Sequence, residues 1–150
     1  MDPKIRIATI EDRLAVEAIV KAAYIHFVPR IGREPAPMGD DYAALILTHR
    51  VHVIESGGKV HGVLVLLHEK DAMLLDNVAV EPGKQGLGIG RKLLEFAEQM
   101  ALKAGYHSIR LYTNEAMTEN IALYSRIGYI ETHRGEEKGL RRVYMTKQLA

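Results

Sequence analysis

The feature that most constrains the fold of this chain is residues 78–92, where an apolar run passes through a glycine-rich stretch into a helical pattern. A helix that begins directly after such a loop presents unpaired amide N–H groups and the positive end of its dipole, which attract phosphate. The stretch has three glycines, Gly86, Gly88 and Gly90, which have no Cβ atoms to hold a pyrophosphate away from those amides. Two basic residues, Arg91 and Lys92, follow directly. The segment therefore predicts an anion site at a strand–loop–helix junction.

The spacing of these glycines excludes the two common nucleotide-binding loops. A Walker loop ends in Gly-Lys-Ser/Thr, whereas Gly90 is followed by Arg91, Lys92 and Leu93. A dinucleotide fingerprint needs the spacing G-x-G-x-x-G, and this stretch has G-x-G-x-G. The expected anion is therefore of another kind.

Before this segment, the pattern predicts a short strand, two helices and an antiparallel meander of three strands. Two adjacent glycines in residues 56–59 suit a tight hairpin turn, and three prolines with Gly32 make residues 29–38 a loop. Thr9 and Asp12 can cap the first helix. Its expected apolar stripe is Leu14, Ala15, Ala18, Ile19, Ala22 and Ala23. The expected strands are residues 5–7, 51–55, 60–68 and 73–80, and the helices end near Phe27 and Thr48.

After Pro82 and Gly83 the period changes from two to 3.6. One helical stripe consists of Ile89, Leu93, Leu94, Ala97, Met100, Ala101 and Ala104, and Gly105 ends it. A strand over 109–113, a helix over 117–126 and a hairpin of 129–132 with 142–146 follow. The order β-α-α-β-β-β-α-β-α-β-β predicts an α/β (α+β) fold, a mixed sheet with helices on its faces.

Composition narrows the classes of ligand and location. The chain has 47% apolar and 26% charged residues, close to the averages of soluble globular proteins, and its 150 residues suit one domain. It has no cysteine for a disulfide or a thiolate zinc site, and its seven histidines show no metal spacing, so no metal is expected. A net charge of +1 gives no reason to expect nucleic acid. Without a secretory signal or a membrane-length apolar run, a cytoplasmic protein is expected.

Two motifs resemble those of the GNAT superfamily of N-acetyltransferases. Gln85-x-x-Gly88-x-Gly90 resembles its acetyl-CoA signature Q/R-x-x-G-x-G/A. Downstream, residues 120–129 resemble its N-x-x-A-x-x-L/Y-Y-x-x-x-G-F segment in compressed form, with Tyr129 in place of Phe. The resemblance implies one N-acetyltransferase domain over residues 1–150, with a mainly antiparallel sheet of about seven strands and four helices. It also implies acetyl-CoA as the acyl donor and an amine as the acceptor, and it is compatible with a homodimer.

The same resemblance suggests roles for individual residues. Tyr124 stands where the family commonly places the acid that protonates the departing thiolate. The alternative is that Tyr124 merely packs beside Ile121 and Ile127 in its helix. The expected cofactor-binding residues are Val78, Ala79, Val80, Gln85, Gly86, Leu87, Gly88, Ile89, Gly90, Arg91, Lys92, Asn114 and Asn120.

The general base is less clearly marked. Some family members use a Glu four residues before the first pantetheine-binding residue, and Leu74 stands at that position here. Asp76 lies on the same face as Leu74 and Val78 if the strand is regular, so it is the candidate base, acting directly or through a water. The alternatives are that Asp76 steadies the sheet as a buried hydrogen-bonding residue, or that a water chain in a dry pocket replaces a base.

The acceptor is also open. In this family the loop over residues 29–38 lies on the acceptor side, so Arg30 and Arg33 are predicted to bind an acceptor carboxylate and Glu34 to attract an amine. The alternative is an ordinary solvated loop. A small-molecule amine is preferred over a protein N-terminus or lysine, because a short proline-rich loop can close a compact pocket. The competing class is a non-catalytic acyl-CoA-binding sensor, against which Tyr124 argues.

Overall fold

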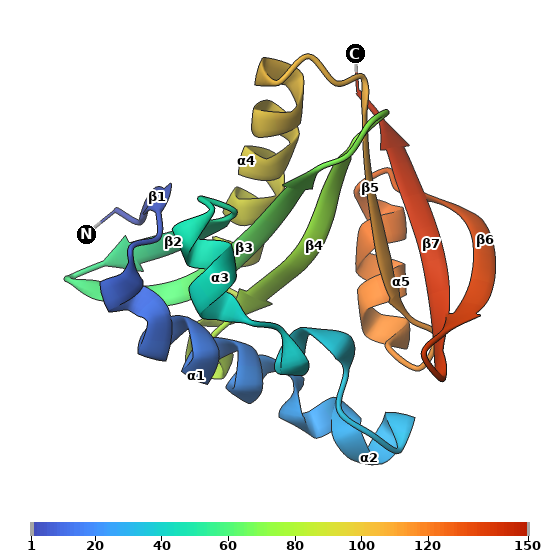
Figure 1. Cartoon of the computed structure of the whole chain (residues 1–150), viewed down its shortest axis with the longest axis horizontal. Coiled ribbons are helices and arrows are strands. Elements are labelled where there is room, and N and C mark those ends of the chain that lie inside the picture. The colour runs from blue at the N-terminus through green and yellow to red at the C-terminus, as the bar shows by residue number, and fades with distance from the viewer. Residues whose placement is uncertain (1, 150) are drawn as a thin grey trace.

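A computed structural model describes residues 2–149, which build a seven-stranded mixed sheet with the order β1-β2-β3-β4-β5-β7-β6 (Figure 1). β4 and β5 are parallel, and the other neighbouring pairs are antiparallel. This confirms the expected element order and the expected meander. The strands are β1 Lys4–Ile7, β2 Val51–Ser56, β3 Lys59–His68, β4 Met73–Val80, β5 Ser108–Asn114, β6 Ile130–Glu137 and β7 Leu140–Gln148.

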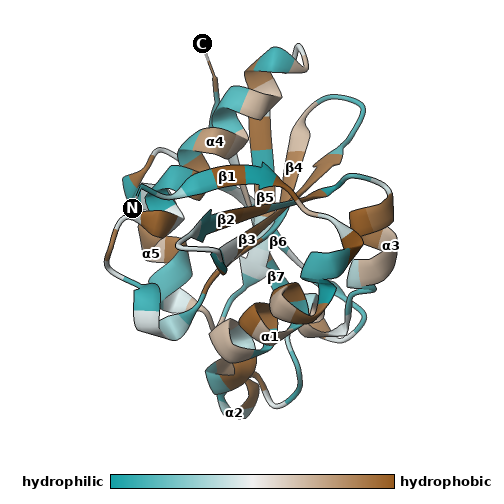
Figure 2. Cartoon of the chain, turned by 90° about the vertical axis from the view of Figure 1, so that its left-hand side faces the viewer, coloured by the Kyte–Doolittle hydropathy of each residue, from teal (hydrophilic) through white to brown (hydrophobic). Residues whose placement is uncertain are grey.

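The helices cover the sheet in two layers, each with its own apolar core. α1 (Arg13–Tyr24) and α3 (Tyr42–Leu47) pack on valines of β2 and β3, whereas α4 (Ile89–Lys103) and α5 (Thr118–Arg126) pack on the opposite face. Figure 2 shows the central strands as largely hydrophobic and α4 as a mixture of hydrophilic and hydrophobic residues. None of the helices in residues 2–149 is both long enough and apolar enough to span a membrane.

The expected stripe of α1 was wrong at most of its positions. Leu14 is 78% exposed, and Ala15, Ala18 and Ala22 are also exposed. The helix buries Val16, Ile19, Val20 and Tyr24, so Ile19 is the one member of the expected stripe that is fully buried. The phase is set before the helix, where the Asp12 carboxylate accepts the backbone N–H of Thr9 at 2.8 Å and pairs with Arg6. Because Asp12 faces inward, Val16 one turn later does so too, and Leu14 is turned to solvent.

The expectation of a plain loop over residues 29–38 was wrong in part. Val28–Ile31 form one helical turn, α2, with Pro29 in its first turn, where no backbone N–H is needed. Gly32 ends α2 in a left-handed conformation (φ 88°), and a 3-10 turn follows at Ala36–Gly39. The chain from Val28 to Asp40 thereby forms a compact segment rather than an extended loop.

An irregularity in β4 separates the two halves of the sheet. Val65 pairs with Asn77 and Leu66 with Leu75, so Asp76 is an extra, bulged residue without a partner in β3. The bulge reverses the side-chain alternation: Leu75 packs in the core under α4, whereas Ala79 packs in the core under α1. Pairing of β4 with β5 also ends at Leu75, and beyond that point the two strands diverge (Figure 1).

Candidate active site

The divergence of β4 and β5 opens a cavity through the middle of the sheet, which we call the central pocket. Its floor is formed by the separating strands, and residues 28–40, which we call the covering segment, lie over one side. It is lined by Tyr24, residues 35–37, Asp40, residues 75–78, residues 111–114, Met117, Asn120, Tyr124, Leu140 and Arg142. Elements distant in sequence therefore converge where the sheet is split.

A buried hydrogen-bond network fixes the wall made by β4. Asn77 is 2% exposed, and its side chain accepts from the Tyr24 hydroxyl at 2.7 Å and donates to the Tyr42 hydroxyl at 2.9 Å. The Tyr24 oxygen also lies 3.0 Å from the carbonyl of Val78, and the Tyr42 hydroxyl donates to the carbonyl of Pro37. Sequence reasoning missed this network, which ties α1, α3 and the covering segment to the edge of the pocket.

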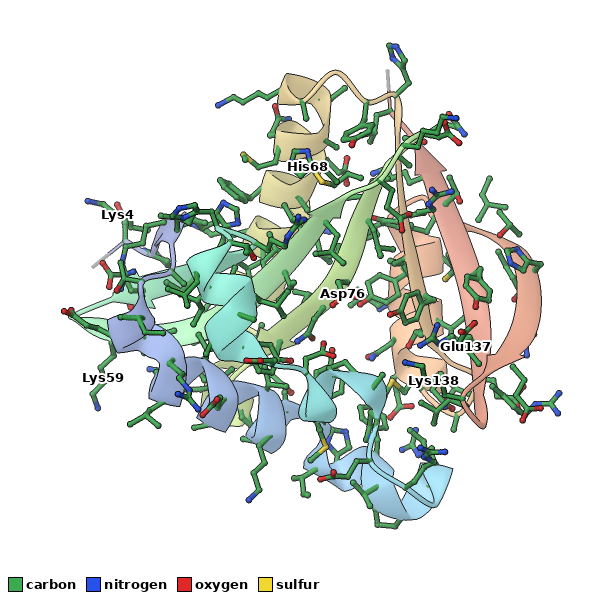
Figure 3. The ribbon with its side chains drawn as sticks, in the orientation of Figure 1. Lys4, Lys59, His68, Asp76, Glu137 and Lys138 are labelled. Carbon is green, nitrogen blue, oxygen red and sulfur yellow. The ribbon has the colours of Figure 1, made fainter. Side chains whose placement is uncertain are left out.

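Asp76 reaches the pocket by another route than the sequence suggested. The assumption of a regular strand was wrong. The bulge at Asp76 interrupts the alternation of side chains, so the faces of Leu74 and Val78 do not determine where Asp76 points. Asp76 lies in the opening between β4 and β5 (Figure 3), and its carboxylate accepts a hydrogen bond from the Tyr112 hydroxyl at 3.2 Å. Burial raises the pKa of Asp76, and the bond from Tyr112 and the charge of Arg142 oppose that rise. A carboxyl group with a raised pKa is a better proton acceptor than an ordinary one.

A second carboxylate, Asp40, lines the same pocket from the covering segment. Partial burial, and then the charge of Asp76, raise the pKa of Asp40 to about 6. Its neighbour Asp41 caps α3, accepting the N–H of Ala44 at 3.1 Å. In the sequence both aspartates are equivalent candidates for that cap, so no signal there marks Asp40 as a pocket residue.

Tyr124 lies where the central pocket meets a second cavity. Its side chain is 7% exposed, lines both cavities and forms no hydrogen bond with any of residues 2–149. Burial raises the pKa of Tyr124 to about 12, so the hydroxyl keeps its proton at neutral pH. The ring packs edge-on against Tyr129, with 5.7 Å between ring centroids, and this contact orients it.

The second cavity runs along β4 to the glycine-rich loop, and we call it the glycine-loop groove. One wall comes from the end of α1 and the residues after it, and the other from α5. It is lined by Ala23, Tyr24, His26, Phe27, residues 78–80, Gln85, Gly86, Gly90, Leu94, Glu119, Asn120, Leu123 and Tyr124. Four residues, Tyr24, Val78, Asn120 and Tyr124, line both cavities, so the groove and the pocket meet at them.

The loop owes its shape to the conformation of two glycines. Gly86 and Gly88 have φ of 84° and 82°, the left-handed region that non-glycine residues avoid, and a Cβ atom at either would meet nothing within 4 Å. Gly90 lies inside α4, where a Cβ atom would make an ordinary 3.7 Å contact with Val80. The backbone therefore requires glycine at positions 86 and 88 even without a ligand. Gly88 caps the N-terminus of α4, so the unpaired amides of its first turn follow at once.

The other predicted cofactor residues are placed unevenly. Gln85 lies at the loop, where its side-chain amide donates to the carbonyl of Val80 at 3.3 Å. Asn114 lines the central pocket and accepts the backbone N–H of Ala116 at 2.9 Å. The side chain of Ile89 is 5% exposed and packs in the core, so this residue can contact a ligand only through its backbone amide. Leu87, Arg91 and Lys92 are exposed beside the loop.

The three residues predicted to bind the acceptor do not line the central pocket. Arg30 forms an ion pair with Glu119 of α5 and donates to the carbonyl of Ala116 at 3.1 Å. Arg33 donates to the carbonyl of Lys138 at 2.9 Å, in the turn between β6 and β7. Glu34 is exposed. The two arginines therefore anchor the covering segment, and Pro35, Ala36, Pro37 and Asp40 face the pocket in their place.

Arg142 of β7 is a pocket residue that the sequence reasoning missed. Its guanidinium carbon lies 4.0 Å from the centroid of the Tyr112 ring. In the sequence Arg142 belongs to a mixed basic and acidic stretch, which predicts a solvated hairpin. Alternation along the strand offered one signal, because Arg142 and Tyr144 share a face and Val143 is buried between them. Among residues 2–149, no group of three His, Asp or Glu side chains is arranged to hold a metal ion.

Comparison with known proteins identifies one matching family model and several solved structures with the same fold. A family model described as an acetyltransferase (GNAT) domain matches residues 48–131, more than half of the chain. No curated protein sequence is detectably similar to the whole chain.

Several solved structures share the architecture over almost the whole length. The PaiA N-acetyltransferase of Thermoplasma acidophilum, in complex with coenzyme A, superposes with a TM-score of 0.82 at 16% identity and covers 99% of each chain. The ribosomal-protein-S18-alanine N-acetyltransferase of Escherichia coli has a TM-score of 0.77 at 19% identity, covering 99% of this chain and 95% of its own. An IAA acetyltransferase of Bacillus cereus has a TM-score of 0.72 at 23% identity, covering 99% of this chain and 100% of its own.

Proposed function

Because the chain belongs to the GNAT family of acetyltransferases, we propose that it transfers the acetyl group of acetyl-CoA to the primary amine of a small molecule bound in the central pocket. The observation that carries this proposal is the position of Tyr124, which is buried, has a free hydroxyl and lines both cavities. A donor in one cavity and an acceptor in the other would meet at this side chain.

The donor side fits coenzyme A on its backbone geometry. Left-handed Gly86 and Gly88 lead directly into the first turn of α4, whose amides can bind a pyrophosphate, and exposed Arg91 and Lys92 add charge beside it. The groove continues from the loop along residues 78–80 to Tyr124, a path suited to an extended pantetheine arm. Acetyl-CoA supplies a thioester carbonyl that an amine can attack.

Two side chains are suited to the proton transfers. A free alkylammonium group has a pKa of about 10.4, so the acceptor must lose a proton before it attacks. Asp76, whose pKa is raised by burial, is suited to receive that proton, directly or through a water. Tyr124, whose pKa burial raises to about 12, keeps a proton that it can give to the departing sulfur.

The covering segment favours a small acceptor over a protein. Pro35, Ala36, Pro37 and Asp40 line one side of the central pocket, and the anchor of Arg33 on the β6–β7 turn holds the segment over it. Gly139 in that turn leaves room for this anchor, because a Cβ atom there would lie 2.8 Å from the Arg33 guanidinium. A folded protein would have to displace the segment to present its amine at Tyr124.

The test compares two tyrosines that touch each other. Tyr124→Phe should keep the fold and the acetyl-CoA affinity and reduce turnover by roughly 10² to 10⁴. Tyr129→Phe is the matched control: its hydroxyl is buried without a partner and lines neither cavity, so turnover should stay unchanged. Release of the CoA thiol, measured with a panel of small amines and short peptides, gives the rates and the acceptor class. Equal rates for Tyr124→Phe and wild type, under conditions where chemistry is rate-limiting, would contradict the proposed role.

A further inference from the structure

The central pocket contains a guanidinium group that the protein itself leaves unpaired. The guanidinium carbon of Arg142 lies over the Tyr112 ring, 4.0 Å from its centroid, and the guanidinium forms no hydrogen bond or ion pair with any of residues 2–149. Arg30 and Arg33, in contrast, are bound to Glu119 and to backbone carbonyls. This cation–π contact positions the Arg142 guanidinium, while its N–H groups have no protein partner among the described residues.

Such a group is suited to one kind of ligand. The planar guanidinium of an arginine donates up to five hydrogen bonds, and its fork geometry matches a carboxylate in a bidentate pair. The carboxylate of Asp76 is not within 4.0 Å of Arg142 and instead accepts from the Tyr112 hydroxyl. Both charges are thus held by one tyrosine, with Asp76 at the hydroxyl end of the ring and Arg142 over its face.

The opposite charge is also present without a partner. Asp40 lines the same pocket at a position open to solvent; the charge of Lys138 acts on its carboxylate, which forms no hydrogen bond or ion pair within residues 2–149. The pocket therefore offers two carboxylates, Asp40 and Asp76, and one guanidinium, none of them neutralised by a direct ion pair. A ligand that carries both an ammonium and a carboxylate group satisfies all three.

Resting on the proposed function, we propose that the acceptor is an amino carboxylate, an amino acid or a close relative, whose carboxylate binds Arg142 and whose ammonium group binds Asp76 and Asp40. Asp76 is two residues from Val78, where the groove and the pocket meet, so the amine end lies toward the donor. Arg142, on β7, receives the other end of the molecule. Leu111 and Leu140 in the pocket wall suit the carbon chain between them.

This assignment separates the amino carboxylate from other acceptors by charge. A diamine could pair its two ammonium groups with Asp76 and Asp40, but it would leave Arg142 without a partner. A monoamine without a carboxylate would also leave Arg142 without a partner, and a peptide N-terminus carries no carboxylate near its amine. Arg142 is accordingly a specificity-determining residue, and Asp40 is a second one at the ammonium end.

The experiment uses acceptor pairs that differ in the carboxylate alone. Turnover is measured at saturating acetyl-CoA with α-amino acids, β-alanine and γ-aminobutyrate, each beside its carboxamide, and with putrescine and a short peptide. Wild type should prefer the carboxylate over the matching carboxamide by roughly 10- to 100-fold in kcat/KM, the range for a charged hydrogen bond.

Variants then assign that preference to one side chain. Arg142→Met should lose the preference, mainly through a raised KM for the carboxylate, so that kcat/KM becomes similar for each acid and its carboxamide. Arg141→Met is the control, because Arg141 is exposed and pairs with Glu115 at 2.8 Å outside the pocket; it should change neither acceptor. Equal losses for acid and carboxamide in Arg142→Met, or a preference for the diamine or the peptide, would overturn the inference.

Calorimetry on the enzyme–CoA complex distinguishes this inference from the proposed function. Binding of the amino acid that depends on Arg142, without release of CoA thiol from acetyl-CoA, would support the subsite and contradict the catalytic proposal. Acetylation of amines in which the wild type does not prefer the carboxylate over the matching carboxamide would support the catalytic proposal and overturn the subsite. If no amino carboxylate bound and no amine of the panel were acetylated, both proposals would be refuted.

Discussion

The glycine-rich loop allows a test in which one chemical change, made at two nearby positions, should have opposite effects. Gly88 has φ of 82° and Gly90 lies within α4. Alanine in the left-handed region costs roughly 1–2 kcal/mol, so Gly88→Ala should lower the free energy of unfolding by about that amount. Alanine inside a helix is favoured over glycine by roughly 0.5–1 kcal/mol, and a 3.7 Å contact with Val80 leaves room for it, so Gly90→Ala should raise stability.

Circular dichroism measures both variants: urea denaturation gives the change in the free energy of unfolding, and thermal denaturation gives the change in Tm. For a domain of this size, 1 kcal/mol shifts Tm by about 2–4 °C, so Gly88→Ala should lower Tm by about 2–8 °C and Gly90→Ala should raise it by about 1–4 °C. A third variant separates conformation from space. Asparagine enters the left-handed region more easily than alanine, so Gly88→Asn should be less destabilised than Gly88→Ala although its side chain is larger.

The same variants test the donor site. Gly88→Ala should weaken acetyl-CoA binding by at least roughly tenfold, about 1.4 kcal/mol, because it disturbs the turn that presents the amides of α4. Gly90→Ala should bind nearly as well as wild type, since the resembled signature admits Ala at this position. If Gly88→Ala had the same free energy of unfolding as wild type, or if Gly88→Asn were less stable than Gly88→Ala, the argument from backbone conformation would be refuted. Unchanged acetyl-CoA affinity in a folded but destabilised Gly88→Ala would contradict the assignment of the loop to phosphate.

Three further outcomes are expected from other parts of the structure. Gly62→Ala should destabilise the fold by about 1–3 kcal/mol in urea denaturation, because its Cβ atom would lie 2.8 Å from Ile54 and 3.0 Å from Leu93; wild-type stability would show that α4 can move away from β3. Asn77→Ala should cost about 1–3 kcal/mol in the same assay, because it removes a buried bridge between two tyrosine hydroxyls; a smaller loss would mean that backbone carbonyls replace it. The pKa of Asp40 is raised to about 6, above its unfolded value near 3.9, so the folded state binds the extra proton and stability should fall as pH rises from about 4 to 6. Asp40→Asn should flatten that part of the stability profile, and an unchanged slope would place the titration elsewhere.

The sequence determined the order and type of the main elements, because these depend on local patterns. Alternation of apolar residues marked the strands, and the period of 3.6 after Pro82 marked α4 with Gly105 at its end. The glycine loop was also legible, since left-handed glycines before a helix are a local requirement of the backbone. In α1 the expected stripe consisted mostly of alanines, which mark a buried face weakly, and the phase of the helix was wrong.

The composition of the central pocket was decided by tertiary structure. Asp76 enters it because β4 bulges and pairing with β5 ends at Leu75, and neither event has a signal in residues 73–80. Arg30 looked free in the sequence, but the fold pairs it with Glu119, 89 residues away. Asp40 and Arg142 become pocket residues because the covering segment and β7 meet across the split sheet. Local periodicity reports which face of an element is buried, whereas the partner of a charged side chain depends on which distant segments the fold brings beside it.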